Sequence, residues 1–132
     1  YEAHIHPLWR KPRLMLGTDG VTVLADDTCT TCHSDRDAAG APQVPAGQLA
    51  LTDDPSSDEP DQKVAYRELL VADVDPPPLL AGRAHESVRF FAKFGPGGSH
   101  QGRLTPAELK LVSEWVDIGA QYFNDPFAAP LD

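Results

Sequence analysis

The strongest constraint on this chain is a short run in which two cysteines are followed directly by a histidine: Cys29-Thr30-Thr31-Cys32-His33. This spacing is typical of the covalent attachment of haem c. The two thiols add to the two vinyl groups of a porphyrin, and the adjacent imidazole reaches the iron as its proximal ligand. The motif therefore predicts one haem c, held by Cys29 and Cys32, with His33 bound to the iron.

Two other kinds of site use a similar pattern. A redox-active dithiol is expected between a strand and a helix of a βαβ unit, whereas the stretch after this motif (34–42) contains Asp, Gly and Pro and breaks up quickly. A zinc site would need Cys29, Cys32, His33 and a distant histidine, and sequence-adjacent ligands are uncommon in structural zinc sites. No other cysteine is left for a disulfide framework. Haem is the favoured prediction.

Length and charge bound the function. The 132 residues suffice for one domain (1–132) with a modest core. The formal net charge of −9 is opposite to the basic surface of a nucleic-acid-binding protein, so no nucleic-acid partner is expected. No apolar run approaches the length of a membrane span, and no signal peptide is recognisable. Because the chain begins at Tyr1, we expect it to be a mature or excised part of a longer exported product.

Two stretches lack a pattern of regular structure. Prolines at 7 and 12 make a continuous helix unfavourable over residues 1–18, which we predict to be an extended arm lying over the core. Its cations Arg10 and Arg13 are either a solvated basic turn or partners of the haem carboxylates. Residues 34–61 read as an acidic loop, which is either a solvated surface or a docking face for a cationic partner.

Several segments predict regular elements. Residues 21–24 are compatible with a strand, and Asp27 or Thr28 is placed to cap a short helix carrying the motif. Helices are predicted from about 61 to 71 and from 84 to 94. The clearest local signal is at Thr105, followed by a proline and, three residues on, by Glu108, which predicts a capping box at the start of a final helix. Trp115 on that helix is a candidate for packing against the haem.

The chain resembles a mono-haem cytochrome c domain of the class I general type. The resemblance is carried by the attachment motif and by the run from Leu104 to Tyr122, which is similar to the closing helix of cytochrome modules in large exported bacterial multidomain proteins. It implies a mainly α fold, a small cytochrome c-like helical bundle around one covalently bound haem with long loops. It also implies export to the periplasm or the extracellular space, because haem is attached to thiols outside the cytoplasm in bacteria.

The chain departs from this family at the second iron ligand. Class I cytochromes usually supply a methionine from a loop after the attachment motif, but the only methionine here, Met15, precedes it. The corresponding loop, 94–103, offers His100 among several glycines, and it ends at Arg103, a further candidate partner of the haem carboxylates. We therefore predict ligation by His33 and His100, with Met15 as the main alternative and an open distal position as the third.

Two filled axial positions predict electron transfer rather than catalysis, with a redox protein, cationic if electrostatically steered, as partner. A His/His iron is expected at lower potential than a Met/His iron. The alternative function is a haem c enzyme or a sensor of a small ligand, with an open or displaceable distal position.

Overall fold

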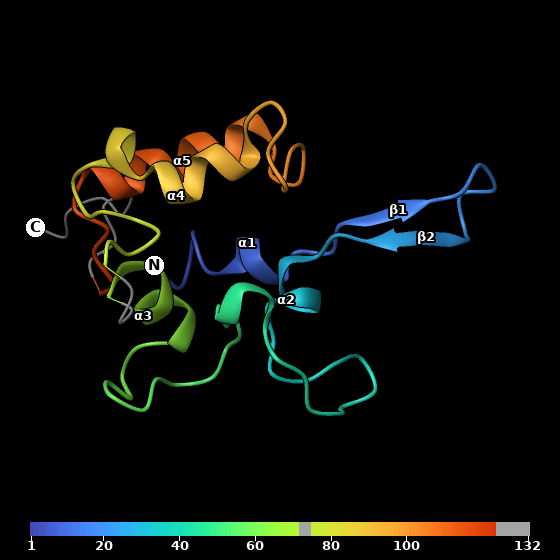
Figure 1. Cartoon of the computed structure of the whole chain (residues 1–132), viewed down its shortest axis with the longest axis horizontal. Helices are drawn as coiled ribbons and strands as arrows, with labels where there is room; N and C mark the ends of the chain where they lie inside the picture. Colours follow the sequence, from blue (N-terminus) through green and yellow to red (C-terminus); the bar gives the residue numbers. More distant parts are fainter. Residues whose placement is uncertain (72–74, 124–132) are drawn as a thin grey trace, which may run out of the picture.

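The computed structural model describes residues 1–71 and 75–123. Long connections precede and follow η1, separate α3 from η2 and precede α5, whereas the other elements follow one another closely along the chain (Figure 1). They are α1 (Pro7–Arg10), β1 (Leu14–Leu16), β2 (Val23–Asp26), α2 (Cys29–Cys32), η1 (Ala46–Gln48), α3 (Val64–Leu70), η2 (Ala84–Glu86), α4 (Val88–Phe91), η3 (Ala92–Phe94) and α5 (Pro106–Asp117).

The predicted cytochrome c-like helical bundle is wrong. Among the described elements α5 is the longest helix, with 12 residues, whereas α1, α2 and α4 have four residues each. A two-stranded antiparallel sheet of β1 and β2 stands beside these helices, and loops and turns connect them. The sequence holds 13 prolines and 10 glycines, which end helices early or make them costly.

The helix predicted over 84–94 shows how a local bond divides a helical pattern. At Ser87 the backbone leaves the helical region, with φ −79° and ψ 52°. The buried hydroxyl of Ser87 donates to the carbonyl oxygen of Arg83 (3.0 Å) and accepts from the amide of Leu80 (2.8 Å). Because this side chain offers the backbone other partners, the segment forms η2, α4 and η3 in place of one helix.

The prediction for the final helix is confirmed. Thr105 is the N-cap of α5, and its hydroxyl accepts from the amide of Glu108 at 3.1 Å. The carboxylate of Glu108 accepts in return from the amide of Thr105 at 3.0 Å. Pro106 occupies the first helical position, where its missing N–H costs nothing.

The N-terminal segment 1–18, predicted as an extended arm, has two different parts. Residues up to Arg10 form turns and α1, and Ile5, Leu8 and Trp9 are buried in the core. Only β1 is extended, and it belongs to a hairpin outside the core. The core joins this segment to α3, α4 and α5, and it consists of Tyr1, Ile5, Leu8, Trp9, Leu51, Ala65, Leu69, Leu79, Ala84, Phe90, Leu104, Val112, Trp115, Val116, Ala120 and Tyr122.

An ionic cluster fixes the N-terminal segment to α5. The buried carboxylate of Glu108 accepts from Lys11 Nζ at 2.7 Å and from Arg13 Nη1 at 2.9 Å. Burial alone would raise the pKa of Glu108, but the bonds from Lys11, Arg13 and the amide of Thr105 lower it to about 2. The side chain of Arg13 is itself only 10% exposed. Removing the carboxylate would therefore leave a buried cation without its counter-charge.

In the part of the chain that the structure describes, no helix is both long enough and apolar enough to cross a membrane.

We expect Glu108→Gln to lower the free energy of unfolding at pH 7 by about 3 kcal/mol, because it leaves Arg13 buried and unneutralised. The pKa of Glu108 is lowered from 4.5 to about 2, so its contribution is complete above pH 4.5 and is lost as the pH falls toward 2. Urea unfolding between pH 7 and pH 2 measures both effects. The control is Glu114→Gln, whose exposed pair with Lys110 (3.7 Å) should change stability by less than about 0.5 kcal/mol. Equal acid sensitivity of the wild-type protein and Glu108→Gln would contradict this assignment.

Candidate functional site

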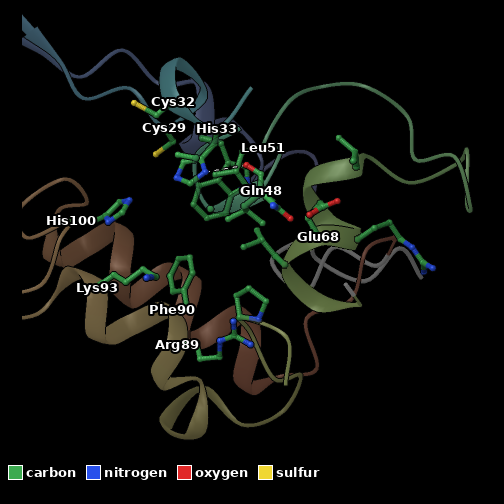
Figure 2. A pocket seen from close by; sticks show the side chains of 18 of the residues that line it. Cys29, Cys32, His33, Gln48, Leu51, Glu68, Arg89, Phe90, Lys93 and His100 are labelled. Atoms are coloured by element: carbon green, nitrogen blue, oxygen red, sulfur yellow. Dashed lines mark hydrogen bonds between the residues drawn. The ribbon is translucent and has the colours of Figure 1, made fainter. Parts of the chain in front are cut away.

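The attachment motif opens onto a cavity of about 770 Å³, within the usual size of ligand pockets (Figure 2). Most of its walls come from α2 with His33, the segment 46–51, α3, and the segment from α4 to Arg103, and Trp9 of α1, residues 56–58 and Pro78 also line it. Figure 2 shows Cys29, Cys32 and His33 along one side and His100, Lys93 and Phe90 along another. Segments far apart in sequence therefore face one space.

The attachment motif forms the short helix α2. Thr28 is at the N-cap position, but its hydroxyl accepts from the amide of Arg13 (2.9 Å) and makes no cap bond to α2. Asp26, not the predicted Asp27 or Thr28, supports the start of α2: its carboxylate accepts from the amide of Thr28 and the hydroxyl of Thr31, both at 2.9 Å. The end of β2 thus fixes the position of the cysteines.

The two cysteines differ in exposure. Cys29 is half-buried and Cys32 is exposed, and both line the cavity. Burial raises the pKa of the Cys29 thiol, against the smaller opposing effect of the nearby Arg13 guanidinium. One thiol therefore sits within the wall of the cavity and the other at its rim.

The ring of His33 is oriented by a backbone carbonyl. Its Nδ1 lies 3.0 Å from the carbonyl oxygen of Leu49, which can only accept, so Nδ1 carries the proton. Burial lowers the pKa of His33 and keeps the imidazole neutral. Nε2 is then unprotonated and can donate its lone pair to a metal, and a bond from Nδ1–H to a carbonyl oxygen is the usual way in which a ligating histidine is oriented.

His100 lies on the glycine-containing loop that follows η3. The amide of His100 donates to the carbonyl oxygen of Lys93 at 2.8 Å, which closes the loop, and Nδ1 lies 2.8 Å from Ser99 Oγ. Burial, together with the positive charge of Arg103, lowers the pKa of His100. Nδ1 is thus the atom of each imidazole that contacts a protein oxygen at 3.0 Å or less, Leu49 O for His33 and Ser99 Oγ for His100.

The two imidazoles are brought together by the fold. Their ring centres are 6.0 Å apart and their planes differ by 28°. Centroid separations of about 4.5–7 Å are usual for aromatic rings in contact, so His33 and His100 form a stacked pair by this measure. Two imidazoles on opposite sides of one metal ion, each bound through Nε2 at about 2.0 Å, have centres about 6.3 Å apart. The separation of the two ring centres agrees with both arrangements.

The other predicted ligand is placed elsewhere. Met15 lies on β1, 55% exposed, and is not among the residues that line the cavity. Among residues 1–71 and 75–123, no group of three or more His, Cys, Asp and Glu is arranged to hold a metal ion. The zinc site considered from the sequence is therefore not formed by these residues.

The candidate haem-carboxylate partners are separated by the structure. Arg10 pairs with Asp53 at 3.0 Å and Arg13 with Glu108, and neither lines the cavity. Arg103 does line the cavity, and its Nη2 lies 3.5 Å from Oδ1 of Asp27. The candidate packing residue Trp115 is buried in the core, donates to the carbonyl oxygen of Gln121 (3.2 Å) and does not reach the cavity.

Several lining residues were not predicted for the site. The aromatic wall contains Trp9, Phe90 and Phe94, with the rings of Trp9 and Phe90 6.2 Å apart at 71°. Lys93 and Arg89 add positive charge to the same wall. Trp9 belongs to the segment 1–18 that was predicted to lie over the core, but nothing in the sequence shows that it also borders the cavity.

Comparison with family models, with curated proteins and with solved structures finds no match for this chain.

The loop that carries His100 depends on one glycine. A Cβ on Gly98 would lie 2.6 Å from the carbonyl oxygen of Ala92 and closer still to that of Lys93, the acceptor of the His100 amide. We expect Gly98→Ala to open the loop, so that the His100 amide exchanges its hydrogen at least about tenfold faster, a local loss of about 1.4 kcal/mol. The measurement is residue-resolved hydrogen exchange by NMR.

Gly95→Ala is the matched control, because its Cβ would meet only the Ala92 oxygen at 3.6 Å and its φ of −78° suits any residue. Unchanged exchange at His100 in Gly98→Ala would show that the loop is not closed as described.

Proposed function

We propose that this chain binds one haem c through Cys29 and Cys32 and works as an electron-transfer module with two histidine ligands. The observation that carries the proposal is the placement of His33 and His100, 6.0 Å apart at a cavity that both cysteines line. The proposal concerns the site and does not need the helical bundle of the resembling family, because the four residues are held by α2, a carbonyl oxygen and one loop.

Each residue has a distinct role. Cys29 and Cys32 would form the thioether links, and His33 and His100 would ligate the iron. When bound, haem supplies a one-electron Fe(II)/Fe(III) couple. With two protein ligands on the iron, no coordination position would be left for a substrate. Nε2 of His33 is unprotonated, because Nδ1–H donates a hydrogen bond to the carbonyl oxygen of Leu49.

The surroundings suit a large apolar group with charged edges. Trp9, Phe90 and Phe94 offer aromatic surface against which a flat apolar group can pack. The cations Arg103, Lys93 and Arg89 line the same cavity and replace Arg10 and Arg13 as proposed partners of the two haem carboxylates. The exposed Cys32 places one side of the site at the surface, where electrons can pass to a partner protein.

The partner is proposed to be a redox protein with a cationic contact surface. The chain carries a net charge of −9, and the loop around Asp53 to Asp61 is acidic. A negative charge of this size accelerates the encounter with a positively charged protein, and it makes the association rate constant fall as salt is added. The need for thiol-linked haem places the protein in the periplasm or outside the cell.

Covalent haem is the first test. Produced in a host that attaches haem c, the protein should keep one haem per chain after denaturation in urea, with an absorption spectrum of a thioether-linked haem. Cys29→Ala and Cys32→Ala should each leave a single link, and the double variant should lose the pigment on denaturation. The control is Ser34→Ala, beside the motif, which should keep the haem. A colourless wild-type protein from this host would refute the proposal.

The second test identifies the distal ligand. The reduced wild-type protein should bind carbon monoxide slowly or not at all, whereas His100→Ala should turn the ferric spectrum high-spin and bind carbon monoxide at once. Met15→Ala is the control and should change neither, because Met15 is exposed on the hairpin. Immediate, stoichiometric binding by the wild-type protein would favour the enzyme or sensor with an open distal position.

A further inference from the structure

The β1–β2 hairpin extends away from the rest of the molecule (Figure 1). It carries a cluster of exposed large apolar side chains, 46–80% exposed: Leu14, Met15, Leu16, Val21, Val23 and Leu24. None of them belongs to the core cluster of the described residues. Between Leu14 and Ala25 the only charged residue is Asp19, near the turn. The hairpin is therefore an apolar, nearly neutral arm on an acidic protein.

A hairpin of this kind needs further strands. Two strands alone are marginally stable in water, and three or more strands or packing on a helix are needed for independent stability. Here both strands are edge strands of a two-stranded sheet in the described structure. Exposed edges with apolar side chains are templates for pairing with another strand.

The two edges are not equivalent. β2 contains an irregularity, since Met15 pairs with Ala25 while Leu16 pairs with Val23, which leaves Leu24 as an extra residue. Bulges of this type disturb an edge and oppose pairing. β1 runs without an extra residue, so its outer edge is the one suited to pairing.

The backbone of β1 presents two free peptide groups on that edge. Toward β2, the Arg13 carbonyl oxygen accepts from the Asp27 amide (2.9 Å), and the Gly17 amide donates to the Thr22 carbonyl oxygen (2.7 Å). Hydrogen-bonding direction alternates along a strand, so Leu14 and Leu16, which lie between these residues, direct their N–H and C=O groups outward. The order Leu14-Met15-Leu16 is symmetric about Met15, which suits an antiparallel partner of the same sequence.

We propose that β1 pairs with β1 of a second copy of this chain, around a twofold axis at Met15, to give a four-stranded antiparallel sheet. Leu14 then lies opposite Leu16 of the partner subunit, in two hydrogen-bonded pairs, and the two Met15 side chains are neighbours. Because the paired strands are antiparallel, the tip of each hairpin reaches the base of the other. This interface does not require bound haem.

The size and charge of the hairpin favour a second copy of this chain as its partner. Edge-to-edge pairing covers the outer edge of β1 with part of Leu14, Met15 and Leu16, and it leaves Val21, Val23 and Leu24, on the turn and on β2, exposed. The interface is therefore smaller than a standard protein–protein interface, so the dimer is weak and concentration-dependent. A cationic partner would gain little here, because the hairpin offers it only one carboxylate between Leu14 and Ala25.

Sedimentation equilibrium of the full chain, with and without haem, tests the oligomeric state. The mass should rise from monomer to dimer as the concentration increases to about 500 µM, above the micromolar Kd expected for a small interface. Since two chains of net charge −9 repel, added salt should strengthen the dimer. A protein that stays monomeric, or a dimer that salt dissociates, would overturn the proposal.

Hydrogen exchange identifies the interface independently of any variant. The amides of Leu14 and Leu16 should be unprotected in dilute protein and become protected as the dimer forms, whereas the Met15 amide should be protected throughout. The double variant Leu14→Lys/Leu16→Lys should remain folded, because both side chains are exposed, and should be monomeric. The control is Val44→Lys. Val44 is also apolar and is 77% exposed, but it lies outside the hairpin, so this variant should dimerise as the wild-type protein does. Dimerisation of the double variant would refute pairing through β1.

Discussion

The carboxylate of Glu108 is the point at which three separate parts of the chain meet. It closes the capping box of α5, accepts from Lys11 after α1, and pairs with Arg13 at the base of the hairpin. The backbone amide of Arg13 in turn donates a hydrogen bond to the hydroxyl of Thr28, the residue immediately before Cys29. A single buried charge with three donors thereby sets the position of α2 relative to α5. Charge-assisted bonds are strong when desolvated, so this junction replaces the contacts that a longer helix would supply.

The N-terminal segment takes the place of a bundle helix in the core. Trp9 Nε1 donates to Tyr1 Oη (2.9 Å), and Tyr1 Oη lies 3.0 Å from His6 Nδ1. Burial lowers the pKa of His6, so the neutral ring donates from Nε2 to Asp53 (2.5 Å). Aromatic rings thus enter the core with their polar atoms paired, which makes their burial favourable. Trp9, held in this way, is also a wall of the cavity.

The candidate site combines parts of different rigidity. Cys29 and Cys32 lie on α2, which Asp26 supports, and His33 is oriented by a carbonyl oxygen of the segment 46–51. His100 depends instead on a loop that only a glycine at position 98 allows to close. The cysteines are therefore fixed by Asp26, close by in sequence, and His33 by a carbonyl oxygen 16 residues further on, whereas the loop of His100 closes on the nearby residue Lys93.

The sequence by itself determined the features whose cause is local. The capping box follows from Thr105 and Glu108, two residue types three positions apart. The short helix α2 coincides with the motif that begins at Cys29, because the hydrogen bonds that form it lie within a few residues. Position in the chain favoured His100 over Met15 as the partner of His33. His100 lines the cavity and Met15 does not, and ligation of iron by His100 stays a prediction.

Only the tertiary structure decided which residues share a surface. The helical bundle was expected from the resemblance to cytochromes c, and the single helix over 84–94 from its helical pattern. Hydrogen bonds such as those of Ser87 and the frequent Pro and Gly residues leave short helices instead. Arg13 and Trp115 carry the chemistry expected of haem neighbours, yet a buried carboxylate holds the first and the aromatic core holds the second. Trp9 and Phe90 line the cavity because distant segments fold together, and no local pattern encodes such a contact.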